Sequence, residues 1–174
     1  MKKPIPFWQF AGFVFTSLFG TLLHFLYDWT KSGFWALFSG VNESTWEHMK
    51  LLFFPMFAYA VIQSRFFAKD YKNFWGAKLW GILGSLAVIP TLFYTYKGAL
   101  GVSADWFNIL IFYIAAAVGY IIDARLLKRE KKFPKPTAAI IILSIVALLF
   151  FVFTFIPPKI PLFEDPLTKT YGII

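Results

Sequence analysis

The stretch AAIIILSIVALLFFVF at Ala138–Phe153 decides the fold class, because it contains no charged residue and a single polar one, Ser144. Its flanks extend the apolar segment to about residues 136–156. At about 1.5 Å per helical residue, that length crosses a hydrocarbon core of about 30 Å. Pro157 and Pro158 follow directly and end the helix. The segment therefore predicts a membrane-spanning helix.

Four earlier segments, at about residues 7–29, 45–67, 74–96 and 104–127, are also largely apolar. The first lacks the short apolar core and the small-residue cleavage site of a signal peptide, so we expect it to remain as a helix. The second carries Glu47, His48 and Lys50 in its first turns. We expect an all-α integral membrane bundle of five transmembrane helices, forming one domain over residues 1–174 with a tail at 157–174.

The composition also indicates a chain that faces hydrocarbon. Hydrophobic residues make up 59% of the 174 residues and charged residues only 15%. A soluble domain carries about 45–50% apolar and about 25% charged residues. A soluble enzyme and a disordered regulator are thereby excluded. The absence of Cys also removes thiol catalysis, thiolate metal ligands and disulfides.

The basic residues are distributed unevenly over the predicted loops. If the five spans cross alternately, the N-terminus and the second and fourth loops share one side, which receives most of the 17 Lys and Arg residues. The positive-inside rule then places the N-terminus in the cytoplasm and the C-terminus outside the cell membrane. This sorting explains the net charge of +8, so we expect no nucleic-acid partner. The residues assigned to the cytoplasmic side are Lys2, Lys3, Arg65, Lys69, Lys72, Lys78, Arg125, Lys128, Arg129, Lys131, Lys132 and Lys135.

Three polar segments lie on the predicted outer side. Residues 24–29 (HFLYDW) end the first span, residues 41–48 (VNESTWEH) begin the second, and residues 161–172 follow the fifth. Residues 33–40 are apolar but too short to cross, so we expect them to shield whatever their neighbours build. Phe163 and the turn-forming Asp165-Pro166 pair predict that the tail folds back over the outer ends of spans one and two.

Three motifs in these segments, HFxYDW, NESTWEH and DPxTxxYG, carry a resemblance to a known family. Their residues here are His24, Tyr27, Asp28 and Trp29, then Asn42–His48 with Lys50, and finally Asp165-Pro166 with Tyr171-Gly172. They resemble a family of small bacterial multi-pass membrane proteins, and the spans match over essentially the whole chain. That family has no assigned function, so the resemblance implies the multi-pass fold but no substrate or cofactor.

Imidazole and carboxylate groups in the first two polar segments suggest a metal site. His24 and Asp28 are four residues apart and share one helix face, while an antiparallel second span brings His48 to the same membrane depth. Zn²⁺ in catalytic sites uses such ligands and keeps one position open. The residues assigned to bind zinc or a similar divalent ion are His24, Asp28, Glu43 and His48. Glu47 and His48 are assigned to proton transfer, and Asn42 is assigned to orient one of these side chains.

Four of these residues, His24, Asp28, Glu43 and Glu47, also have a simpler explanation, whereas His48 is harder to explain in this way. Ser44-x-x-Glu47 matches a capping box, Glu43 suits the dipole of a helix start, and His24 with Asp28 forms an ordinary interfacial pair. The spacing also matches no metalloprotease signature such as H-E-x-x-H. A shared site requires the side chains to converge around one point, whereas capping residues lie at separate helix ends.

Three classes of function remain open. The first is a metal-dependent or acid–base hydrolase that acts on a lipid or peptide at the extracytoplasmic face. The second is a non-catalytic accessory or binding subunit of an envelope membrane complex. The third is a small transporter, which the absence of an internal repeat disfavours. Besides the lipid bilayer, the expected partner is therefore a substrate or another membrane subunit.

Overall fold

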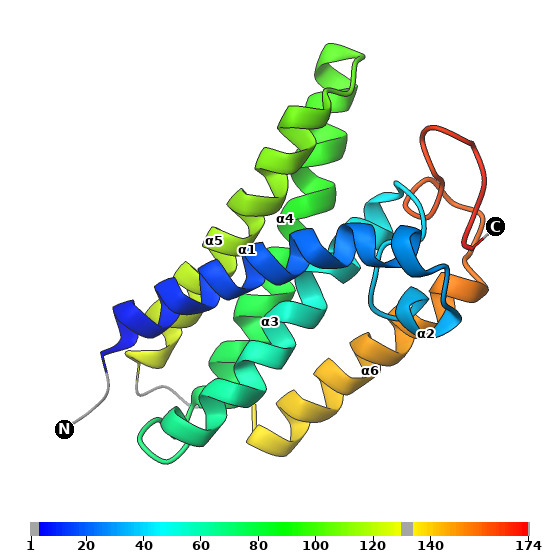
Figure 1. The fold of residues 1–174 in the computed structure, drawn as a ribbon. Helices are drawn as coiled ribbons and strands as arrows, with labels where there is room; N and C mark the ends of the chain where they lie inside the picture. Colours follow the sequence, from blue (N-terminus) through cyan, green and yellow to red (C-terminus); the bar gives the residue numbers. More distant parts are fainter. Residues whose placement is uncertain (1–3, 130–133, 174) are drawn as a thin grey trace.

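A computed structural model of the chain describes residues 4–129 and 134–173 (Figure 1). This part is all-α, apart from an isolated bridge between Glu164 and Tyr171 in the tail. Five long helices run between two ends of the molecule, and α2 is a short turn beyond the end of α1. The helices are α1 (Ile5–Thr30), α2 (Gly33–Ala36), α3 (Thr45–Phe67), α4 (Phe74–Leu100), α5 (Asp105–Leu127) and α6 (Pro136–Phe155).

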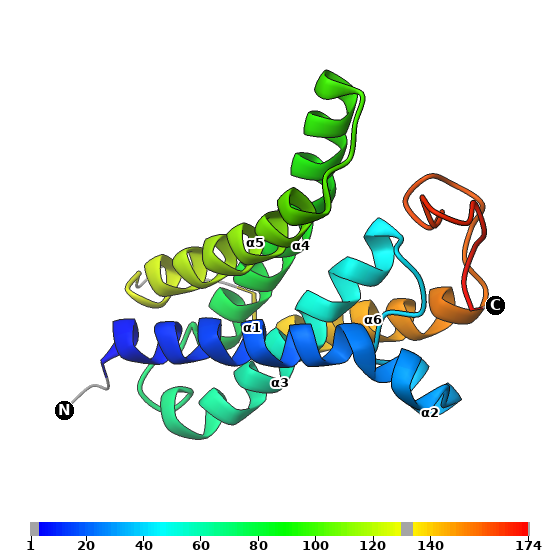
Figure 2. The ribbon, with the colours of Figure 1, turned by 45° about the horizontal axis from the view of Figure 1, so that its top comes forward.

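The two ends of the bundle hold different elements. What we call the basic end contains the start of α1, the turn between α3 and α4, the end of α5 and the start of α6 (Figure 1). The site end contains the end of α1, α2, the start of α3 and the tail that follows α6. The α4–α5 hairpin projects away from α2 and the tail in both views (Figures 1 and 2). Its tip therefore stands apart from the other elements of the site end.

Among the residues that the structure describes, four helices, α1, α4, α5 and α6, are long and apolar enough to cross a membrane. They make the chain a multi-pass, membrane-type helical protein, but the prediction of five such helices is wrong for residues 45–67. α3 forms over that range, yet Glu47, Lys50 and Gln63 make it more polar than its neighbours. All three side chains are buried in the bundle instead of facing lipid. Polar side chains on the face of a helix that packs against protein do not meet lipid, and this explains the difference.

α4 and α5 approach each other closely near the basic end. A Cβ atom at Gly81 would lie 2.9 Å from the carbonyl oxygen of Gly119, so neither glycine tolerates a side chain without a shift. Beside this contact, Lys78 of α4 and Asp123 of α5 form a buried ion pair, and the Gln9 side chain of α1 lies next to the Asp123 carboxylate. The sequence-based charge count placed Lys78 among the basic residues of the cytoplasmic side. In the structure it is buried instead, and Asp123 balances its charge.

Candidate functional site

Three side chains from separate segments meet at the site end. His24 comes from α1, Glu43 from the connection before α3, and His48 from the first turns of α3. Nε2 of His24 lies 3.7 Å from one Glu43 oxygen, and Nε2 of His48 lies 3.5 Å from the other. The two imidazole rings are 5.6 Å apart between centroids. The sequence-based expectation that the two histidines approach each other is confirmed.

The separations approach those of a metal centre. One ligand atom from each of His24, Glu43 and His48 lies within 4.8 Å of the other two. Ligands at about 2.1 Å from a tetrahedral zinc ion are roughly 3.4 Å apart. The two His–Glu separations are close to that value, and the two imidazoles need to approach by a further ångström or so. Small side-chain rotations supply such a movement, because the residues are only partly buried.

Local hydrogen bonds hold this cluster in place. Ser44 caps α3 by accepting the Glu47 amide proton at 3.3 Å. With its proton on Nδ1, His48 donates to the carbonyl oxygen of Ser44 at 2.9 Å, so that Nε2 faces Glu43. Metal-binding histidines usually have such a partner on the second nitrogen. His24 has none: its Nδ1 is buried without a hydrogen-bond partner among the residues described.

Glu43 remains a carboxylate in this setting. The neighbouring His24 imidazole, 3.7 Å away, is the main cause that lowers the pKa of Glu43 below its usual value, and the nearby His48 ring acts in the same direction. Partial burial opposes both effects without reversing them. A carboxylate between two imidazoles provides the negative charge that a divalent cation requires.

A small cavity of about 30 Å³ adjoins the cluster. Its lining includes Asp28 and Asn42 together with the three clustered residues. Asp28 also forms an exposed ion pair with Lys31, at 2.8 Å. Asn42 accepts a hydrogen bond from the Ser44 amide at 2.9 Å and donates one to the carbonyl oxygen of Gly172 at 2.9 Å. Of the six residues assigned to the site from the sequence, five line one cavity.

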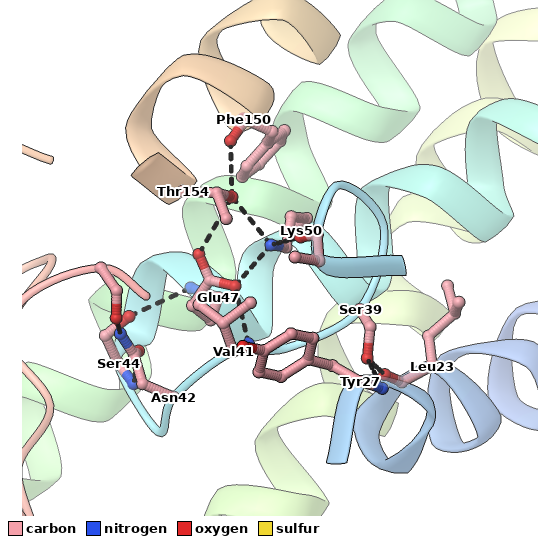
Figure 3. A network of polar contacts seen from close by, with 12 residues as sticks. Leu23, Tyr27, Ser39, Val41, Asn42, Ser44, Glu47, Lys50, Phe150 and Thr154 are labelled. Atoms are coloured by element: carbon pink, nitrogen blue, oxygen red, sulfur yellow. Dashed lines mark hydrogen bonds and ion pairs between the residues drawn. The ribbon is translucent and has the colours of Figure 1, made fainter. Parts of the chain in front are cut away.

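Glu47 is the exception, because its carboxylate belongs to a second, buried network (Figure 3). Nζ of Lys50 lies 2.5 Å from Glu47 Oε2, and both side chains are almost fully buried. The amide of Val41 donates to the same carboxylate at 3.1 Å. Lys50 also donates to Thr154 of α6 and to the carbonyl oxygen of Ala36, both at 2.8 Å. The general-base role of Glu47 stays a prediction, while its observed contacts tie three segments together.

Lys50 lies in the first turns of the predicted second span and in a family motif, but sequence reasoning assigned it no role in the site. Its spacing of three residues from Glu47 was the available signal, since i,i+3 pairs meet on a helix face. Of the two hydrogen bonds that the capping box predicts, one forms. Ser44 caps the helix as expected, but Glu47 accepts the Val41 amide instead of the amide of Ser44.

The tail folds back onto the start of α3, which is one of the two span ends that it was predicted to cover. The Trp46 amide donates to the carbonyl oxygen of Leu162 at 3.0 Å, and the Phe163 ring lies 4.7 Å from the Trp46 ring. With the Asn42–Gly172 hydrogen bond, these contacts fix the tail on the start of α3. The tail faces α1 only across the cleft described next.

A cleft of about 760 Å³ opens beside the cluster, between α1 and the outer parts of α4 and α5. His24, Glu43 and His48 belong to its lining, so the cluster lies on the cleft wall. The remaining wall is mostly apolar, with Phe25, Phe93 and Phe112 among its residues. No sequence pattern indicated this cleft, because it depends on the angle at which the α4–α5 hairpin leaves the bundle (Figure 2).

The chain belongs to a family of unknown function, designated DUF6512, whose pattern matches residues 2–173. This confirms the resemblance to an uncharacterised family. No curated protein and no solved structure matches the chain.

Proposed function

We propose that the protein is a metal-dependent membrane hydrolase whose divalent ion, zinc, is bound by His24, Glu43 and His48. The observation that carries the proposal is the convergence of these three ligand atoms, from three separate segments, within 4.8 Å of one another. Capping and dipole roles would leave them at separate helix ends. Two imidazoles and one carboxylate are the ligand set of several catalytic zinc sites.

The surroundings of the cluster support hydrolysis. Three protein ligands leave one position for water, and zinc lowers the pKa of bound water to about 7. The cluster faces a cleft of about 760 Å³, so a substrate has a route to that position. Asp28 lines the adjoining cavity and is the carboxylate best placed to accept a proton there. Asn42, in the same lining, provides a side-chain amide to orient a polar group.

Metal analysis of the purified chain tests the proposal. We expect about one zinc ion per chain after equilibration with zinc and removal of excess, as for a mononuclear site. Because each imidazole is a ligand, His24→Ala and His48→Ala should each weaken zinc binding at least about 10-fold. Asp105→Asn removes a carboxylate from the same cleft but outside the cluster, and it should bind zinc as the wild type does.

Equal zinc content in the wild type and a His24→Ala/His48→Ala double variant, with thermal unfolding showing both to be folded, would refute the metal site. The accessory-subunit class would then be favoured, because the polar cluster would have no ion to activate water. If the protein binds zinc but hydrolyses no ester or amide, the metal site stands and the hydrolase function is refuted.

The orientation in the cell membrane is also a proposal: the basic end is cytoplasmic and the site end, including the C-terminal tail, is extracytoplasmic. The exposed positive charges at the basic end support it. A reporter active only in the cytoplasm should work when inserted at Asp70, between α3 and α4, and fail at Gly101, between α4 and α5. The reverse pattern would contradict the orientation. The exposed basic residues described at this end are Arg65, Lys69, Lys72, Arg125, Lys128, Arg129 and Lys135.

A further inference from the structure

The lining of the cleft at the site end changes from apolar to polar toward the tip of the α4–α5 hairpin. Its apolar part includes Ile89, Ile109 and Phe112, while Lys97 and Ser103 lie toward the tip of the α4–α5 hairpin. A cleft of roughly 300–1,000 Å³ accommodates a ligand of the size of a drug molecule, and this one measures about 760 Å³. An occupant must therefore have one long apolar part and one polar end.

The cleft is continuous with the apolar surface of the protein. Phe25 on one wall is 45% exposed and Ile109 on the other is 58% exposed. These helices are among the four that are long and apolar enough to cross a membrane, so their exposed apolar side chains face hydrocarbon. A molecule already dissolved in the bilayer can therefore enter sideways, with no passage through water.

One basic residue, Lys97, and one acidic residue, Asp105, lie at the polar end of the cleft. Lys97 lines it, and its ammonium group lies 5.4 Å from the centroid of the Phe93 ring. Within the part of the chain that the structure describes, no carboxylate lies close enough to Lys97 to form an ion pair. An unpaired cation beside an apolar cleft complements an anionic headgroup attached to an acyl chain.

We propose that this cleft binds one acyl chain of an anionic phospholipid, with the headgroup at Lys97 and the ester linkage beside His24, Glu43 and His48. As a statement about the substrate it rests on the proposed hydrolase function, since a lipid whose ester lies at the metal cluster is the substrate class. As a statement about binding it depends only on the cleft and Lys97. The two can therefore fail separately.

Native mass spectrometry of the full chain in detergent, titrated with phosphatidylglycerol or phosphatidylcholine, tests the binding. We expect a single phosphatidylglycerol to bind more tightly than phosphatidylcholine. Lys97→Gln should reduce the affinity for phosphatidylglycerol about five-fold and leave phosphatidylcholine unchanged, as for loss of one lysine near a headgroup. Lys159→Gln removes an exposed lysine at the same end but outside the cleft, and it should have no effect.

A second pair of variants tests the acyl-chain site. Thr21→Trp places a large ring in the cleft and should reduce the affinity for both lipids at least about 10-fold. Leu22→Trp changes the adjacent residue, which is outside the lining, and should bind both as the wild type does. Equal binding by all four variants would indicate lipid held only on the outer surface and overturn the proposal. A dimer that Thr21→Trp abolishes would assign the cleft to a second copy of the chain and also overturn it.

The His24→Ala/His48→Ala variant separates lipid binding from the metal proposal. It lacks the cluster but keeps Lys97 and the apolar lining, so it should bind phosphatidylglycerol within about three-fold of the wild type while losing zinc. Zinc loss with retained lipid supports both proposals. A wild type that binds zinc but no lipid refutes the cleft assignment alone, and one that binds lipid but no zinc refutes the metal site alone.

Discussion

Replacing Lys50 by Met is expected to lower the free energy of unfolding by about 3–5 kcal/mol, the typical cost of removing one partner of a buried ion pair. The variant leaves the Glu47 carboxylate almost fully buried with no countercharge. It also removes the hydrogen bonds from Lys50 to Thr154 and to the carbonyl oxygen of Ala36. Chemical unfolding of the full chain in detergent micelles measures the difference.

Two control variants make the Lys50 result specific. Lys31→Met breaks a pair with the same i,i+3 spacing, Asp28–Lys31, on the exposed surface, and it should leave stability unchanged because water screens such pairs. The double variant Lys50→Met/Glu47→Gln should recover most of the loss, since no buried charge remains and the introduced side-chain amide still offers an oxygen to the Val41 amide proton. A Lys50→Met variant as stable as the wild type would show that the buried pair does not form.

The second large effect is expected at the opposite end of the bundle. Asp123→Ala should also cost about 3–5 kcal/mol, because Lys78 is then buried without its partner between α4 and α5. The effect should be confined to stability. Zinc and lipid binding depend on the site end, so both should match the wild type once the folded fraction is equal.

Chemical unfolding again provides the measurement, with Arg125→Met as the matched control. Arg125 lies two residues further along α5 and is exposed, so its replacement should change stability little. The double variant Lys78→Met/Asp123→Leu should approach the wild type, because apolar groups of similar size replace both charges. A stable Asp123→Ala variant would contradict the role assigned to the pair.

The long helices could be predicted from the sequence because each depends on local composition. α6 forms over Pro136–Phe155, within a residue of the predicted end, since its apolar run and the following prolines suffice. The residues of α3 were predicted correctly, but the prediction that this helix is as apolar as a membrane-spanning helix was wrong. Whether a polar residue faces lipid or protein depends on its neighbours in space, and a single helix does not specify them.

The candidate site was predictable to a similar degree. His24, Glu43 and His48 were chosen because they are unusual in a membrane protein, and a short connection between antiparallel helices brought them to one depth. Apart from Lys50, three residues along the same helix, the partners of Glu47 were not predictable in the same way. Thr154 is 107 positions away in the sequence, and nothing local indicates that α6 lies against the start of α3.

The contact between Lys50 and Thr154 also bears on how the protein is made. It joins residues 104 positions apart, so the ribosome completes α6 long after α3 has reached the translocon. A charged side chain is costly when a helix enters the bilayer alone, although less so in the first turns, where Lys50 lies, than at the helix centre. α3 therefore acquires its final surroundings only when α6 arrives. In a chain truncated before α6, Lys50 would lack the Thr154 hydroxyl that accepts its hydrogen bond.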